Sequence, residues 1–259
     1  MKRVAIAVAG LIAAWLIAMV IFGAMRGDAA AERIAHQLGE SLHADATVGA
    51  HDLALVRGRF AMEQLHLLHD DAVGRLEVAV GQVDCDLLPL GLALVDGECR
   101  ELAVHDMTMS VSSGALFALR PPKQAPPRAQ RVVIDHARLD FAPSAFLPSL
   151  GRISIEIDHA EAGPTVFRTP LSFLFALRSL TARLELPAGI TLRLGYGHGV
   201  LSVAGSLFGS TPVALPVQLP VAAAAHSGKE EVDALGEFGK RVAEELVEKR
   251  ANDWIHQKL

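Results

Sequence analysis

The clearest strand pattern in this chain is Leu102-Ala-Val-His105-Asp106-Met-Thr-Met-Ser-Val111. Its apolar residues alternate with polar or small ones, which is typical of a strand with one buried face. After the His-Asp pair the alternation resumes in the opposite phase. Such a phase change needs a tight turn or one extra residue in the strand, and a β-bulge supplies the extra residue.

Two further stretches share this design, each with an Asp-His pair inside an alternating strand. They are Val132-Val-Ile-Asp-His136-Ala-Arg-Leu-Asp-Phe141 and Ile153-Ser-Ile-Glu-Ile-Asp-His159-Ala-Glu-Ala162, and Leu65-His-Leu-Leu-His69-Asp-Asp71 is a weaker copy. Alternation continues from Val48 to Leu219, so we expect the middle of the chain to be a repeating meander of strands, kinked at these Asp and His residues. Three copies of the pair favour a structural role in turns and bulges over a single active site.

One stretch interrupts the strands: Arg120-Pro-Pro-Lys-Gln-Ala-Pro-Pro-Arg-Ala-Gln-Arg131. Because prolines fix φ and remove hydrogen-bond donors, it predicts an exposed, semi-extended loop that divides the β region in two. A solvated linker is the simpler interpretation, and a docking site for a protein partner is the alternative.

The later part of the β region has clear turn signals. Strands are expected over residues 180–186, 190–196, 199–203 and 213–219, with turns at Pro187-Ala-Gly-Ile190 and Gly197-His-Gly199. Residues 171–180 fit either a buried strand or a short helix.

The N-terminus carries an uncharged run from Val4 to Met25, between Lys2-Arg3 and Arg26. At about 1.5 Å per residue this run gives roughly 33 Å of helix, enough to cross the hydrocarbon core of a bilayer. We therefore expect a membrane anchor over residues 1–27, and a cleaved signal peptide with its site near Ala29-Ala30-Ala31 is the alternative. The positive charges before the run keep the N-terminus in the cytoplasm, so the rest of the chain is exported.

Two amphipathic helices frame the β region. Residues 30–42 place Ile34, Leu38 and Leu42 at a spacing of four, which predicts a short helix. Residues 227–259 are rich in charge and carry a broad apolar stripe, which predicts a terminal helix.

The two cysteines, Cys85 and Cys99, would lie in an oxidising compartment if the chain is exported. If their strands pair across Asp96-Gly97, a disulfide closing about fifteen residues contributes on the order of 3 kcal/mol. Two small buried thiols are an equally good interpretation.

The charged and histidine residues exclude several functions. A net charge of −5 leaves no broad basic surface for nucleic acid. The best metal candidate is His66-x-x-His69 with Asp70 and Asp71, but residues three apart in a strand point to opposite faces, so we expect no metal site. The sequence has no Gly-x-Ser-x-Gly, His-Glu-x-x-His or phosphate-binding glycine loop, so we expect neither catalytic residues nor a cofactor.

The anchor, the short helix and the kinked strands together resemble the AsmA-like proteins of the bacterial envelope, relatives of TamB and of bridge-like lipid-transfer proteins. The resemblance rests on Leu38-Gly-Glu-Ser-Leu-His-Ala-Asp-Ala-Thr-Val48, Leu53-Ala-Leu-Val-Arg-Gly-Arg-Phe60, Leu87-Leu-Pro-Leu-Gly91 and residues 132–141, and it spans residues 1–145. It implies a curved, taco-like β-groove with an apolar inner face that holds or conducts lipid. It implies no catalytic residues.

The expected fold is mainly β: a transmembrane helix, a short amphipathic helix, a curved antiparallel β-meander forming a groove, and a C-terminal amphipathic helix. The expected boundaries are 1–27 for the anchor, 28–220 for the periplasmic groove domain and 227–259 for the terminal helix. The candidates for the lipid groove share one strand face: Leu67, Val78, Val80, Leu102, Val104, Ile134, Leu139 and Ile155.

The expected function is that of a non-enzymatic, single-pass protein of the bacterial inner membrane that binds or relays phospholipid or glycolipid and contributes to envelope lipid homeostasis. An envelope protein could dock on the 120–131 loop or on the terminal helix. Two alternatives stay open: an envelope scaffold or secretion-apparatus subunit with a closed core, and an LptC-like lipopolysaccharide relay. A contiguous apolar concavity favours transport, whereas a fully packed two-layer core favours the scaffold.

Overall fold

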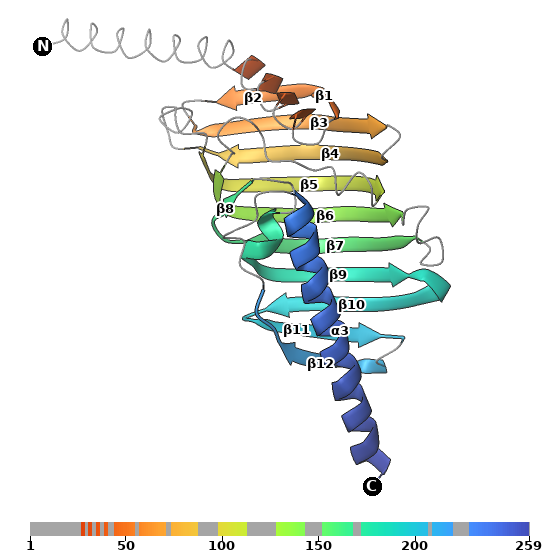
Figure 1. Cartoon of the computed structure of the whole chain (residues 1–259). Coiled ribbons are helices and arrows are strands. Elements are labelled where there is room, and N and C mark those ends of the chain that lie inside the picture. The colour runs from red at the N-terminus through yellow and green to blue at the C-terminus, as the bar shows by residue number, and fades with distance from the viewer. Residues whose placement is uncertain are drawn as a thin grey trace, which may run out of the picture.

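The computed structural model describes the chain in blocks. The described residues are 27–28, 31–32, 35–36, 39–40, 44–54, 57–70, 74–87, 98–112, 128–142, 152–167, 172–206, 209–219 and 228–258. Within them, twelve strands form one open sheet, and a single long helix, α3 (Gly228–Lys258), follows the last strand (Figure 1). This confirms the mainly β fold and the C-terminal helix predicted from the alternation and the charge-rich tail.

The strands lie side by side in nearly the order of the chain. Their bounds are β1 Asp45–Thr47, β2 Ala50–Ala54, β3 Arg59–Asp70, β4 Arg75–Asp86, β5 Glu98–Ser112, β6 Arg128–Ala142, β7 Ile153–Ala162, β8 Thr165–Val166, β9 Leu177–Leu186, β10 Ile190–Gly197, β11 Val200–Gly205 and β12 Gly209–Pro216. The order across the sheet is β1-β3-β4-β5-β6-β7-β9-β10-β11-β12. The short strands β2 and β8 pair with β3 and β6.

The sheet is mixed, because β5 and β6 run parallel from Glu98 opposite Arg128 to Ser112 opposite Ala142. The other described pairs are antiparallel. The prediction of a purely antiparallel meander is therefore wrong at this pair. Alternation has the same period in both kinds of ladder, so the pattern carries no information on strand direction.

The parallel pair also changes the predicted 120–131 loop. Residues 128–131 belong to β6, where Arg128 pairs with Glu98 and with Val166. The loop prediction is wrong for these four residues, because ladder pairing on both sides holds them in the sheet. Residues 120–127 lie outside the described residues.

Five strands share an irregular position at one level of the sheet, which we call the kink row. It comprises Gln64, Gly81, Asp106, His136 and Asp158, and each of these residues is skipped by the pairing of its strand with its neighbours. Three of them have a left-handed backbone, with φ of 54° at Gln64, 55° at Asp106 and 56° at His136. At Gly81 the strands approach closely, since a Cβ there would lie 3.1 Å from the Asp106 Cβ.

The kink row confirms the kinks predicted at His105-Asp106, Asp135-His136 and Asp158-His159. At β7 the irregularity is a bulge in the strict sense, because the register against β9 shifts between Ile157 and His159. The kink predicted at His69-Asp70, in the weaker copy, is wrong. The kink of β3 is at Gln64, and His69-Asp70 ends the strand. Asp70 pairs with Arg75 across the following turn, which accounts for the polar residues there.

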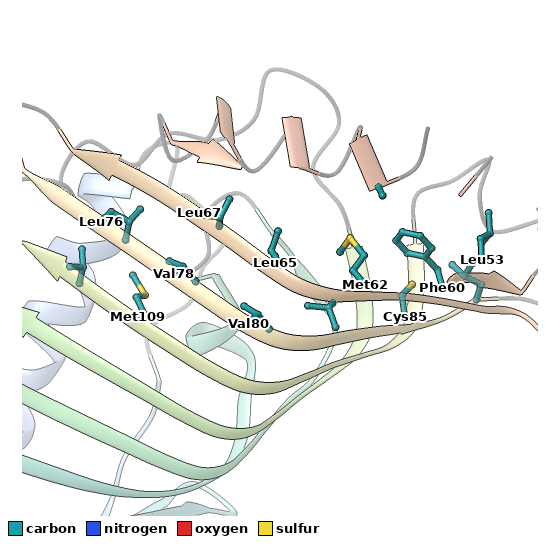
Figure 2. Packing of buried hydrophobic residues seen from close by; sticks show 14 residues of the cluster. Leu53, Phe60, Met62, Leu65, Leu67, Leu76, Val78, Val80, Cys85 and Met109 are labelled. Atoms are coloured by element: carbon teal, nitrogen blue, oxygen red, sulfur yellow. The ribbon is translucent and has the colours of Figure 1, made fainter. Parts of the chain in front are cut away.

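Three clusters of buried residues lie on one face of the sheet. The first joins β2 to β5 and includes Ala31 from the N-terminal segment. Figure 2 shows its labelled side chains on the inner side of the bend in the strands. The second cluster is covered by the 3-10 helix η3 (Ser172–Ala176) through Phe173, and the third joins β10–β12 to Leu246 of α3.

The late hairpins follow the predicted turns. β9 and β10 are joined through the 3-10 turn η4 (Pro187–Gly189). The turn between β10 and β11 is His198-Gly199, with φ of 51° and 74°, as a two-residue hairpin loop requires. Residues 171–180, which fitted either a strand or a short helix, contain one of each: the 3-10 helix η3 is followed by β9.

The predictions for the N-terminus fall largely on undescribed residues. Residues 1–26 of the predicted anchor lie outside the described residues, as do Ile34, Leu38 and Leu42 of the predicted short helix. The described residues between 27 and 40 are helical. Among the residues that the structure describes, no helix has both the length and the hydropathy needed to cross a bilayer.

Candidate functional site

The apolar face of the sheet is built from rows of side chains that cross the strands. Residues paired between neighbouring strands lie on the same face, so a row can be followed from pair to pair. The first row is Leu67, Val78, Met109, Leu139, Ile155, Leu184 and Leu192, and the second is Leu65, Val80, Met107, Ala137, Ile157, Ala182, Leu194, Val203 and Val213. Both rows lie on one side of the kink row.

Two more rows lie on the other side of the kink row. The third row is Met62, Val83, Val104, Ile134, Ala160, Leu180, Tyr196, Leu201 and Leu215, and the fourth is Phe60, Cys85, Leu102, Val132, Ala162 and Leu177. We call these four the apolar rows. They stay on one face because every kinked strand changes phase at the same level.

All eight groove candidates from the sequence lie in the apolar rows. Their burial differs: four are buried, namely Leu67, Val78, Val80 and Ile134. The other four are half-buried, namely Leu102, Val104, Leu139 and Ile155. The structure therefore brings the candidates together on one face, with the half-buried ones on β5, β6 and β7.

The apolar rows contain residues that the sequence reasoning missed. On the N-terminal strands these include Met107 and Met109, and the rows then continue through β9 to β12. Leu180, Leu184 and Leu194 are half-buried like their counterparts on β5. The period of two in residues 177–203 was the signal that could have added them.

The opposite face of the sheet carries charged residues in cross-strand pairs. Arg131 Nη1 lies 2.8 Å from Glu101 Oε2, and Arg131 Nη2 lies 3.1 Å from Glu161 Oε2. The hydrogen bond from Arg131 lowers the pKa of the Glu161 carboxyl below its usual value. Charged pairs of this kind are typical of a sheet face that contacts water, and the apolar rows lie on the opposite face.

Asp135 lies between two histidines from the neighbouring strands. His159 Nδ1 is 2.6 Å from Asp135 Oδ1, and His105 Nδ1 is 3.5 Å from Asp135 Oδ2. These three residues form the row beside the kink row, on the charged face. The recurring Asp-His pairs are thereby explained, since in each strand one member occupies the kink and the other makes the cross-strand contact.

The described histidines form no metal centre. His66 pairs with Ala79 on the charged face, whereas His69 pairs with Leu76, which is 1% exposed on the apolar face. The two imidazoles therefore belong to opposite faces, as their spacing predicts. Among the described residues, no group of three or more His, Cys, Asp or Glu side chains is arranged to hold a metal ion.

Cys85 of β4 and Cys99 of β5 form a disulfide, with their Cα atoms 5.4 Å apart. Cys85 pairs with Leu102 in the ladder, so the bridge runs diagonally to a residue three positions earlier in β5. Both residues pack in the cluster of β2–β5. The bridge ties the first residues of β5 to the end of β4.

The geometry offers an aliphatic surface and a charged, solvated surface on the two sides of one sheet. No protein-family model matches the chain, and no curated protein matches it. The resemblance to the AsmA-like proteins therefore stays an expectation from the sequence.

Proposed function

We propose that this chain is an envelope protein, anchored in the bacterial inner membrane, that binds or relays lipid on the apolar face of its sheet. One observation carries the proposal: the second and third apolar rows each cross nine strands without a polar break. An apolar surface of this extent has to be covered by protein or be available to an apolar ligand.

The middle of the sheet supplies the surface for the ligand. Much of the apolar face is packed, since Leu76 on β4, Ala160 on β7 and Val203 on β11 are each 1% exposed. Between them Leu102, Val104 and Leu139 keep part of their surface uncovered. A ligand lying across β5, β6 and β7 would bury this remaining apolar area.

The chemistry of the rows suits acyl chains. Most of the side chains are Leu, Val, Ile, Met and Ala, and Tyr196 and Phe60 are the aromatic members of the four rows. Aliphatic surfaces hold flexible methylene chains through non-directional burial, which contributes about 0.8 kcal/mol per CH₂ group. Phospholipid or glycolipid is therefore the ligand class that we propose.

The N-terminal segment supports a position next to the membrane. Asp28 Oδ1 lies 2.8 Å from His51 Nε2 on β2, and Ala31 is 4% exposed in the first buried cluster. Residues that directly follow the predicted anchor are thus attached to the first strands of the sheet. With the anchor in the inner membrane, this attachment would hold the β1–β3 edge close to the lipid surface.

Photo-crosslinking in native membranes tests the proposal. A photo-reactive residue at Val104 or Leu139 should form adducts with phospholipid or glycolipid, detected by mass spectrometry. Ala103 and Arg138 are matched controls, because each is the preceding residue of the same strand and faces the charged side. Absence of lipid adducts at Val104 and Leu139 in folded protein would contradict lipid binding.

A substitution separates lipid binding from simple packing. Leu139→Glu should abolish lipid retention after gentle detergent purification while changing the free energy of unfolding only modestly, because the half-buried site can solvate the carboxylate. In a dry core the same change costs several kcal/mol. Unfolding of the variant without any lipid adduct in the wild-type chain would favour the alternative below.

The alternative is an envelope scaffold or secretion-apparatus subunit with a closed core. Deep burial across the apolar face from β4 to β11 favours it, since Leu76, Ala160 and Val203 are as buried as ordinary core residues. In a scaffold with a closed core, a protein partner would dock on residues 120–127 or on α3 and not on the apolar rows. Photo-reactive residues at Val104 and Leu139 would then form no lipid adducts.

A further inference from the structure

Among the strands that the structure describes, β12 is the last of the open sheet and has a neighbour, β11, on one side only. Exposed edges present free N–H and C=O groups, to which another chain can add a strand. The other side of β12 is therefore the place where a second copy of this chain could extend the sheet. Its ability to do so depends on which backbone groups of β12 point outward.

The ladder to β11 fixes the direction of these groups. Val217 N donates to Gly199 O over 2.8 Å, and Pro216 pairs with Val200. Bonded and non-bonded pairs alternate in an antiparallel ladder, so Val213 and Leu215 use their backbone groups toward β11. Ala214 and Pro216 therefore point outward, and Pro212 lies next to them, at the register shift between β11 and β12.

Two of these three residues are prolines, Pro212 and Pro216, which have no N–H to donate. The third, Ala214, has its carbonyl oxygen occupied, because Lys249 Nζ of α3 donates to Ala214 O over 2.5 Å. An added antiparallel strand needs a donor and an acceptor at each outward residue. Each of the three positions thus lacks one of the groups that strand addition uses.

Helix α3 is held where Lys249 can make this contact. Leu246 is 7% exposed, and Phe238 and Val242 pack with it against β10–β12. In Figure 1 α3 continues past β12, so the helix crosses the edge of the sheet. Lys249 is about one turn beyond Leu246 and reaches Ala214 of β12 from there.

We propose that Pro212, Pro216 and Lys249 form an edge cap that prevents a second copy of this chain from adding a strand to β12. The cap is independent of what lies on the apolar face. It makes β12 the end of the apolar rows, which do not continue onto the sheet of another copy.

A variant that removes the cap tests this directly. The full chain carrying Pro212→Thr, Pro216→Thr and Lys249→Ala is compared with the wild type in detergent, with light scattering to give the protein mass at rising concentration. We expect the triple variant to reach about twice the protein mass of the wild type. Pro187→Thr and Lys240→Ala are matched controls away from β12 and should behave as the wild type does.

A mass profile of the folded triple variant identical to that of the wild type would overturn the proposal. Hydrogen exchange of the wild-type chain gives a second measurement that needs no variant. The Ala214 amide should exchange fast at every protein concentration, because it points away from β11. Protection of this amide that increases with concentration would mean that the wild-type edge takes a strand, and it would overturn the proposal as well.

Discussion

The left-handed backbone of Asp106 and His136 is what turns β5 and β6 at the kink row. Asp, Asn and His enter the left-handed region several-fold more often than other non-glycine residues. This preference is why the Asp-His pairs predicted the kinks of β5 and β6 correctly. At Asp158 of β7 the φ is not left-handed, and the kink there is a register shift against β9. Gln64 has the same backbone without belonging to this group, so nothing in its side chain marked the kink of β3.

Substitutions at Asp106 should separate backbone strain from side-chain contacts. Asp106→Val should lower the free energy of unfolding by about 1–3 kcal/mol, because β-branched residues fit the left-handed region poorly. Asp106→Gly should leave stability unchanged or raise it, since glycine adopts positive φ freely. Urea unfolding followed by circular dichroism measures both.

Thr108→Val is the matched control for these variants. It lies two residues further along β5, is exposed, and sits in regular strand geometry opposite Ala79. An exposed substitution of this kind changes stability by about 0.5 kcal/mol or less. An equal loss in Thr108→Val and Asp106→Val would show that strain at φ is not the cause.

At the level of elements, the Cys85–Cys99 disulfide fastens β4 to β5. Alkylation of the denatured, non-reduced protein should label neither cysteine, and labelling after reduction should reach both. Reduction should lower the free energy of unfolding by about 3 kcal/mol, the value for a loop of some fifteen residues. Full labelling of both cysteines without reduction would contradict the bridge and favour two buried thiols.

The docking of α3 depends on a narrow stripe of its side chains. Leu246→Ala should lower the free energy of unfolding by about 2–4 kcal/mol, because it empties a buried site against β12. Val247→Ala is the matched control, since Val247 is 66% exposed on the same turn, and should cost less than about 0.5 kcal/mol. Equal effects in urea unfolding would mean that α3 does not pack as described.

The elements differ in how far the sequence could predict them. Single strands were predictable because alternation is local, as the agreement for residues 190–196 with β10 illustrates. The parallel pairing of β5 with β6 was not, because it joins residues about thirty apart and leaves the period of each strand unchanged. Stretch 171–180 stayed ambiguous because a single turn of 3-10 helix is too short to have a period of its own.

For the molecule as a whole, the predicted topology places residues 28–259 outside the cytoplasm. An alkaline phosphatase fused after Leu259 should be active, because Lys2 and Arg3 hold the N-terminus in the cytoplasm. A fluorescent protein that folds only in the cytoplasm should be dark at the same position. An inactive phosphatase together with a fluorescent fusion would contradict the proposed location in the envelope.

The sequence predicted part of the candidate site. The eight candidates were chosen by one-sided alternation up to Ile155, and the register places all of them on one face. The resemblance that suggested a groove stops near residue 145, so it gave no reason to extend the set into β9–β12. Burial could not be predicted either, because it depends on covering elements such as η3 and α3 that are distant in sequence.

The common level of the kinks also bears on how the chain finds its pairing when it folds. Two long strands with plain alternation can slide by two residues and still match apolar to apolar. When both strands change phase at the same level, a shift of two residues moves their kinks out of line. Between the two kinks, the apolar side chains of one strand then lie on the opposite face of the sheet from those of the other. The kink row therefore distinguishes the native register from its nearest competitors, and each new strand is aligned by the one beside it.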